Sequence, residues 1–213
     1  MHSEISQAVA TALLQIKAVF LRPDEPFTWA SGIKSPIYTD NRLVLTAPQQ
    51  RDVVADALAA RIREAFPDVE VLMGTATAGI AHAALAADRL GLPMGYVRAS
   101  AKDHGRANRI EGKLEAGQKV VVVEDLISTG GSVIEVVQAL RAAGAEVLGI
   151  VALFTYGMAA AETAMAKADV RLTTLTSFDA VVHTAVADGL IQPSDEARLL
   201  AFRANPRDES WMK

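Results

Sequence analysis

The 213-residue sequence contains no cysteine. This absence excludes disulfides, thiolate zinc sites and a cysteine nucleophile. Long apolar runs are also missing, because the longest, 147–154, is strand-sized and far below the roughly 18 to 20 residues that span a bilayer. Basic residues number 21 against 25 acidic ones, and the net charge of −4 argues against a general nucleic-acid or anionic-membrane binder. Residues 1–4 lack the start of a signal peptide, so we expect a cytoplasmic protein.

The sequence does have an alternation of apolar segments that is typical of an α/β fold. Apolar residues recur every three or four positions in 5–20 and in 48–66, which predicts two helices separated by an irregular segment, 22–48. Further strands are predicted at 69–73, 94–98, 119–123, 145–154 and 170–176, and further helices at 79–90, 131–143, 159–168, 178–188 and 193–203. Because the strand at 119–123 is rich in valine, we expect a parallel sheet of about five strands with helices on both faces.

The junction after the strand at 119–123 carries the strongest chemical signal. Glu124 and Asp125 end the strand, a turn of small residues from Ser128 to Ser132 follows, and a helix begins at once. Glycines let the backbone approach a ligand, hydroxyls donate to phosphate oxygens, and a helix N-terminus offers free N–H groups. The carboxylates repel phosphate but accept hydrogen bonds from sugar hydroxyls. The combination predicts a site for a phosphorylated sugar, and the alternative is that a hydroxyl of the turn merely caps the helix.

A second signal is the polar segment 99–117, which is too long for an ordinary connection in a compact domain. The range from Arg98 to Lys113 contains five basic and two acidic residues, which gives a local charge of +3 in an acidic protein. Such a segment suits a diphosphate leaving group, because cations stabilise the negative charge that develops as it departs. A solvated, charged hairpin is the alternative.

A third signal is a group of aromatic residues in a chain that is only 5% aromatic. Phe27, Trp29 and Tyr38 lie close in sequence to Lys34 and Arg42. Flat apolar faces and cations suit a planar pyrimidine carboxylate. The same aromatic side chains could equally fasten the N-terminal segment to the core, and the residues alone leave both interpretations open.

Together these segments resemble the type I phosphoribosyltransferases. The acid pair and its turn resemble the motif that binds 5-phosphoribosyl-1-diphosphate (PRPP) in that family. The segments 98–105 and 27–38 are similar to the catalytic loop and the base-side segment of the orotate phosphoribosyltransferases. The resemblance implies a single phosphoribosyltransferase domain, 1–213, with an N-terminal hood at about 1–45 and a core at about 46–213.

The resemblance also implies roles for individual residues. Catalytic roles fall to Lys102, His104 and Asp125. The implied PRPP-binding residues are Arg98, Lys102, His104, Glu124, Asp125, Leu126, Ile127, Ser128, Thr129, Gly130, Gly131 and Ser132, and the implied orotate-binding residues are Ser128, Lys34, Tyr38 and Tyr156. The catalytic loop would reach the site of a neighbouring subunit, which implies a homodimer. Mg²⁺ would be the cofactor, bound mainly through PRPP, with no certain protein ligand.

The sequence departs from the family pattern at several positions. Ala30, Ala78 and Ala99 stand where many relatives have basic residues, and an arginine that contacts the base in relatives is replaced near 155–157. We hypothesise that Lys34 and Arg42 supply the missing positive charge. The turn at 75–80 is open to two interpretations, a diphosphate-binding turn or an ordinary strand-to-helix connection.

The implied reaction transfers the phosphoribosyl group of PRPP to orotate, giving orotidine 5′-monophosphate and diphosphate in pyrimidine synthesis. Two alternatives share the motif at Glu124 to Ser132. A transferase for a purine base should lack the aromatic segment 27–38 and the basic loop. A non-catalytic PRPP sensor that acts on nucleic acid would need a surface that the composition does not indicate.

Overall fold

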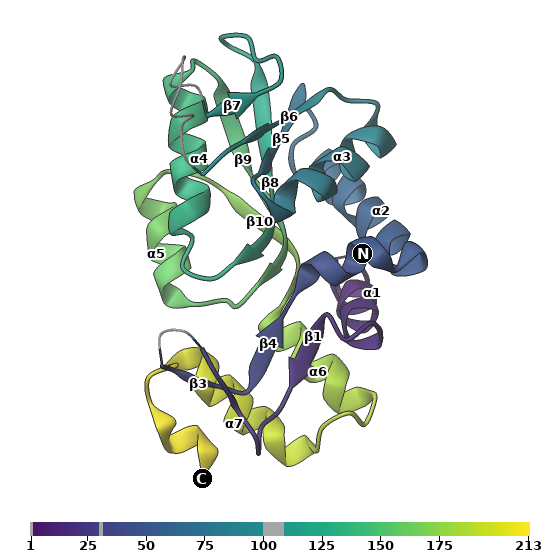
Figure 1. Ribbon diagram of the computed structural model, residues 1–213, viewed down its shortest axis with the longest axis vertical. Helices are drawn as coiled ribbons and strands as arrows, with labels where there is room; N and C mark the ends of the chain where they lie inside the picture. The colour runs from purple at the N-terminus through teal and green to yellow at the C-terminus, as the bar shows by residue number, and fades with distance from the viewer. Residues whose placement is uncertain (1, 30–31, 100–108) are drawn as a thin grey trace.

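The computed structural model describes residues 2–29, 32–99 and 109–213, which form a larger and a smaller lobe (Figure 1). The larger lobe contains a six-stranded sheet in the order β10-β9-β8-β5-β6-β7. Its strands are β5 (Val71–Thr75), β6 (Met94–Val97), β7 (Ile110–Glu111), β8 (Lys119–Ile127), β9 (Glu146–Thr155) and β10 (Leu172–Ser177). Within the described residues, five of these strands run parallel, and β7 pairs antiparallel with β6 at one edge. The predicted α/β fold is confirmed.

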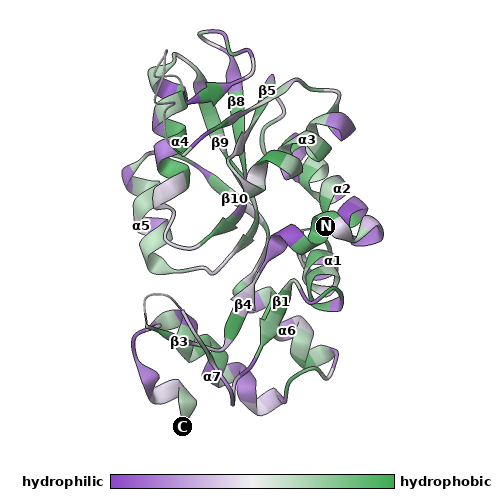
Figure 2. Cartoon of the chain, in the orientation of Figure 1, coloured by the Kyte–Doolittle hydropathy of each residue, from purple (hydrophilic) through white to green (hydrophobic). Residues whose placement is uncertain are grey.

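Helices cover both faces of this sheet (Figure 1). They are α1 (His2–Gln15), α2 (Pro48–Ala65) and α3 (Ala78–Leu90) on one face, and α4 (Gly131–Ala142) and α5 (Ala159–Lys167) on the other. Each face of the sheet has its own hydrophobic core. In β8, Val121 and Val123 belong to the core on the side of α1, α2 and α3, and Val120 and Val122 belong to the core on the side of α4 and α5. Successive side chains of a strand point to opposite faces, which explains the run of four valines. Figure 2 shows the apolar residues of β8 and β9 inside and hydrophilic residues on the outer turns.

The smaller lobe combines segments from both halves of the chain. The strand β1 (Val19–Leu21) pairs with β4 (Ile37–Thr39), and β2 (Phe27–Thr28) pairs with β3 (Lys34–Ser35). Two helices, α6 (Phe178–Ala187) and α7 (Pro193–Ala204), and a 3-10 turn, η2 (Glu209–Met212), complete the lobe. A second 3-10 segment, η1 (Asn41–Thr46), leads from β4 into α2. The boundary of the hood at about residue 45 remains a prediction, since the C-terminal helices share this lobe.

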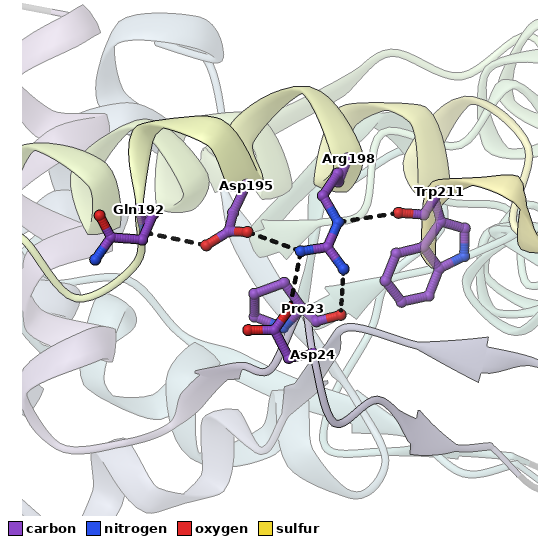
Figure 3. Close-up of polar contacts among 6 residues, drawn as sticks. All are labelled: Pro23, Asp24, Gln192, Asp195, Arg198 and Trp211. Carbon is purple, nitrogen blue, oxygen red and sulfur yellow. Dashed lines mark hydrogen bonds and ion pairs between the residues drawn. The ribbon is translucent and has the colours of Figure 1, made fainter. Parts of the chain in front are cut away.

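Arg198 of α7 connects the N-terminal and C-terminal segments of the smaller lobe (Figure 3). Its guanidinium donates to the carbonyl oxygen of Trp211 at 3.1 Å and to that of Pro23 at 3.1 Å. It also donates to the carboxylates of Asp24 and Asp195, each at 2.9 Å. One side chain therefore holds the C-terminal turn, the first turn of α7 and the N-terminal segment together.

The structure differs from the expected elements in three places. The helix predicted at 5–20 ends at Gln15, because Lys17 adopts a left-handed conformation with φ 56° and Val19 begins a strand. The strand predicted at 119–123, with the acid pair at its end, continues to Ile127, so both carboxylates lie within β8. Within the segment 99–117, two residues form β7. In the described ranges, no helix is long and apolar enough to cross a membrane.

Candidate functional site

Glu124 is a buried carboxyl group near the carboxyl end of the central strand β8, with only 8% of its surface exposed. Its Oε1 accepts a hydrogen bond from the backbone N–H of Asp125 at 2.9 Å. Burial, with a further contribution from the neighbouring Asp125 carboxyl, raises the pKa of Glu124 to about 8. Glu124 is therefore mostly protonated at neutral pH in the unliganded protein. A ligand that offers hydroxyl donors favours its ionised form.

Asp125 is tied to the segment that leads out of the smaller lobe. Its carbonyl oxygen accepts a hydrogen bond at 2.8 Å from Nδ2 of Asn41, which is 1% exposed at the start of η1. The imidazole of His82, on α3, is fully buried, and burial lowers its pKa although the charge of Asp125 opposes that shift. The side chain of Asp125 is only partly buried, so it remains accessible to a ligand.

The turn after β8 leads directly into α4 and leaves its N-terminus open. Gly130 is the N-cap with φ 82°, a conformation that suits glycine. Its lack of a side chain means that, within the described residues, no cap side chain bonds to the first amides of α4. A Cβ on Gly131 would meet nothing within 4 Å, so there is room above the turn. These features oppose the simple capping interpretation and provide free N–H groups beside Ser128 and Thr129, as an anion site requires.

The turn between β5 and α3 lies beside β8 at the same edge of the sheet. Gly74 of β5 is in register with Val123 of β8. A Cβ on Gly79 would lie 2.5 Å from the carbonyl oxygen of Val123, so only glycine permits this close approach. Ala78 is the first residue of α3. The turn at 75–80 is therefore placed where the diphosphate-binding interpretation needs it, and that role remains a prediction.

A cavity of about 540 Å³ opens between the two lobes next to the Ser128 turn. It is lined by Trp29, Ile33, Ser128, Thr129, Tyr156, Met158, Asn205, Pro206 and Arg207. The rings of Trp29 and Tyr156 are 5.7 Å apart, and Tyr156 also packs edge-on against Phe154. The cavity thus joins a flat apolar lining to the hydroxyls of Ser128 and Thr129. Two of the four expected orotate-binding residues, Ser128 and Tyr156, line it.

The other expected base-side residues lie outside the lining of this cavity. Lys34 donates from Nζ to the hydroxyl of Thr28 at 2.8 Å. Tyr38 is 45% exposed and packs against Phe27. These placements leave the base-side roles of Lys34 and Tyr38 as predictions.

Arg42 is engaged by a carboxylate. Its guanidinium binds Asp40 through two nitrogens, at 2.7 and 2.9 Å, and this pairing lowers the pKa of the Asp40 carboxyl. If Arg42 supplies positive charge to the base, as hypothesised, its guanidinium must first leave the Asp40 carboxylate.

The basic loop is described only at its two ends. Arg98 donates its backbone N–H to the carbonyl of Arg109 at 2.8 Å and forms an ion pair with Glu111 at 3.3 Å. The predicted catalytic residues Lys102 and His104 lie outside the described residues. Their roles, like that of Arg98 in PRPP binding, remain predictions.

Two parts of the site escaped sequence reasoning. Asn41 follows a short strand in a segment expected to be irregular, and its bond to Asp125 joins residues 84 positions apart. The segment 205–207 follows α7 without any motif, yet it lines the cavity. Asn41 lies in a polar run, 39–42, that gave no signal of a contact with β8, and residues 205–207 carried no signal either.

Comparison with known proteins agrees with this geometry. A family model of the phosphoribosyl transferase domain matches residues 43–187. The orotate phosphoribosyltransferase of Bacillus subtilis is 54% identical over 209 residues, which cover 98% of this chain and 97% of that protein.

The chain also resembles two solved structures. Orotate phosphoribosyltransferase from Aeropyrum pernix has a TM-score of 0.73 and 32% identity, covering 82% of this chain and 96% of that one. Leishmania donovani UMP synthase has a TM-score of 0.77 and 27% identity, covering 93% of this chain and 42% of that one. The fold, the open turn after an acid pair and these similarities agree, and the chain belongs to the orotate phosphoribosyltransferase family.

Proposed function

We propose that this protein is a pentosyltransferase that transfers the 5-phosphoribosyl group of PRPP to orotate, producing orotidine 5′-monophosphate and diphosphate for pyrimidine synthesis. The observation that carries the proposal is the open N-terminus of α4 at Gly130, which follows the acid pair of β8 along the chain and adjoins Ser128 and Thr129 of the cavity lining. Its free amides suit the 5′-phosphate, and the neighbouring cavity suits a flat base. The nucleotide product of the transfer contains both a 5′-phosphate and a flat base.

The acid pair would bind the ribose hydroxyls. Ser128 to Ser132 hold the 5′-phosphate at the start of α4, which places the sugar over Glu124 and Asp125. Ribose hydroxyls that donate to these carboxylates favour their ionised forms, so Glu124 loses its proton when PRPP binds. The part of the site that contacts the sugar is then negatively charged, and the part that contacts the phosphate, at the N-terminus of α4, is electropositive.

Transfer would proceed by attack of a ring nitrogen of orotate on the anomeric carbon as diphosphate leaves. The bond from that carbon to the diphosphate oxygen breaks, the attacking nitrogen gives up its N–H proton to the diphosphate or to water, the configuration inverts, and the sugar carries oxocarbenium-like charge in the transition state. Arg98, Lys102 and His104 would stabilise the departing diphosphate, and His104 could also supply a proton. Positive charge that acts mainly on the leaving group raises the turnover rate more than it raises the affinity for PRPP.

The described residues fit a magnesium ion that is held mostly by the substrate. No cluster of three or more potential metal-ligating side chains occurs among them, so a cage built from protein alone is not present in that part of the chain. Two adjacent carboxylates at the sugar site fit an ion that takes most of its oxygen ligands from PRPP and water, with Asp125 as the more accessible of the pair. When bound, Mg²⁺ would neutralise part of the diphosphate charge.

The quaternary structure and location belong to the same proposal. The catalytic loop would act in the site of a partner subunit, which makes the active form a homodimer. A cytoplasmic location follows from the expectation that a cysteine-free biosynthetic enzyme acts where its phosphorylated substrates are made.

One assay tests the proposed activity against its alternatives. The purified protein is incubated with PRPP, Mg²⁺ and orotate, and consumption of orotate is followed with adenine and hypoxanthine as control bases. We expect loss of orotate that requires both PRPP and Mg²⁺, and no use of the purines. Turnover of a purine instead would identify a purine transferase. Folded dimer that binds PRPP but turns over no base would identify a sensor.

A further inference from the structure

We infer that Arg207, in the segment between α7 and η2, binds the carboxylate of the acceptor base and selects a carboxylated pyrimidine over an uncharged one. The inference rests on the proposed function, because it concerns the base that occupies the aromatic cavity. It assigns a substrate-recognition role to the C-terminal segment 205–207, which has no recognisable motif in the sequence.

The first support is the charge of the cavity lining. Of the described residues that line it, Arg207 alone carries a charge. The remainder are aromatic or aliphatic side chains, a proline, an asparagine and the hydroxyl residues Ser128 and Thr129. Burial raises the pKa of Tyr156, so its phenol stays neutral. A carboxylate that enters this space leaves water and needs a cation, which only Arg207 supplies within the described lining.

The second support is that nearby cations of the smaller lobe already have partners. Arg42 binds Asp40 through two nitrogens, Arg198 binds two carboxylates, and Arg203 pairs with Asp179 at 2.9 Å. In contrast, Arg207 is exposed and forms no ion pair or side-chain hydrogen bond with the described residues. Its guanidinium is therefore available to a ligand without first breaking an internal contact.

The third support is that the segment carrying Arg207 is held at both ends. Before it, Phe202 packs with Trp29, and after it, Trp211 packs edge-on against Phe202 with ring centroids 5.5 Å apart. Arg198 fixes the carbonyl of Trp211, as Figure 3 shows. A short turn, closed by a hydrogen bond from the N–H of residue 208 to the carbonyl of residue 205, presents Arg207 between these anchors. Such anchoring limits the backbone entropy that is lost when Arg207 binds a ligand.

The chemistry of the two groups favours the base carboxylate over the 5′-phosphate as the partner of Arg207. The phosphate already has the free amides of α4 and the hydroxyls of Ser128 and Thr129. The base carboxylate has no other cation in the described lining. A planar guanidinium binds a carboxylate through two parallel hydrogen bonds, and a lysine ammonium reproduces the charge but not that geometry.

The test compares Arg207→Gln, Arg207→Lys and wild type, with Arg63→Gln as the control. Arg63 is an exposed arginine on α2, away from the cavity. For each protein, kcat and the two KM values are measured, for orotate at saturating PRPP and for PRPP at saturating orotate. Equilibrium binding of orotidine 5′-monophosphate is measured by calorimetry, and the melting temperature reports on folding.

We expect Arg207→Gln to raise the KM for orotate by about tenfold or more, the size of a lost charge-assisted interaction. The KM for PRPP should change by less than about twofold, and Arg207→Lys should recover part of the loss. The melting temperature should not change, since Arg207 has no described intramolecular partner. The control should match wild type throughout.

An orotate KM within about twofold of wild type in Arg207→Gln would overturn the inference while leaving the proposed function intact. An equal rise in the KM for PRPP would overturn it in favour of a phosphate contact. Wild-type protein that neither turns over orotate nor binds the nucleotide would overturn the proposed function and this inference with it.

Discussion

Replacing Glu124 with glutamine removes a carboxyl group that is buried in the centre of the site. The pKa of Glu124 is about 8 in the folded protein, against an ordinary value of 4.5. Each pH unit of such a difference corresponds to about 1.4 kcal/mol. Because Glu124 is almost fully buried, solvent screens this difference little. The wild-type protein therefore loses up to about 5 kcal/mol of unfolding free energy as the pH rises from the ordinary pKa to the raised one.

The sign follows from proton binding. Below pH 4.5 the carboxyl is protonated in both states, so its contribution to the unfolding free energy is fully present. As pH rises from there to about 8, the unfolded chain loses the proton while the folded protein retains it, and stability falls. Glutamine has no proton to lose. The stability of Glu124→Gln relative to wild type must therefore increase with pH over this window and level off above it.

Urea unfolding at a series of pH values, at one protein concentration, measures this difference. Between pH 5.5 and 8.5 we expect the unfolding free energy of Glu124→Gln minus that of wild type to grow by about 3 kcal/mol. Glu146→Gln, at an exposed position on β9, gives the baseline for losing an ordinary glutamate. A difference that stays constant within about 0.5 kcal/mol would show that Glu124 is ionised in the folded protein throughout, and would refute the reasoning.

Three further substitutions test other parts of the site. Lys102→Ala should reduce kcat by about a hundredfold or more while the affinity for PRPP, measured by calorimetry, changes little; equal losses would place Lys102 in ground-state binding instead. Gly130→Ala should destabilise the protein by about 1 to 2 kcal/mol and weaken PRPP binding, since φ is 82° and the new Cβ would lie 2.6 Å from a methionine methyl. Gly131→Ala, where space is open, is its control for stability alone, and equal losses of unfolding free energy in the two variants would contradict the role given to the left-handed turn. Arg198→Ala should lower the unfolding free energy by about 2 to 3 kcal/mol, and a urea-unfolding change below about 0.5 kcal/mol would show that the connection in Figure 3 adds no stability.

The parts of the fold that sequence predicted correctly depend on local pattern. Four valines in a row filled both faces of β8, and glycine at 130 allowed the turn to enter α4 directly. A hydroxyl and glycine turn after a buried strand was therefore placed without any tertiary information, and its role in binding phosphate stays a prediction. The end of this strand was harder to place, because its pairing with β9 continues through Glu124 to Ile127 although two acidic residues lie in that stretch.

The parts that sequence missed depend on contacts between distant segments. The apolar stripe of 5–20 continued through residues that the structure divides between a helix and β1, because Phe20 pairs with Tyr38 across a sheet. The cavity is lined in part by residues 205–207, which are far along the chain from Ser128. Periodicity reports which face of an element is apolar, but not which remote segment covers it.

Identification of the products tests the proposed reaction most directly. Wild-type protein is incubated with PRPP, orotate and Mg²⁺, and the phosphorus-containing products are resolved by nuclear magnetic resonance. We expect orotidine 5′-monophosphate and diphosphate in equal amounts, and unchanged PRPP when orotate is omitted or replaced by adenine. Unchanged PRPP in the complete mixture, with the protein shown to be folded and dimeric, would contradict the assignment of this site to orotate phosphoribosyl transfer.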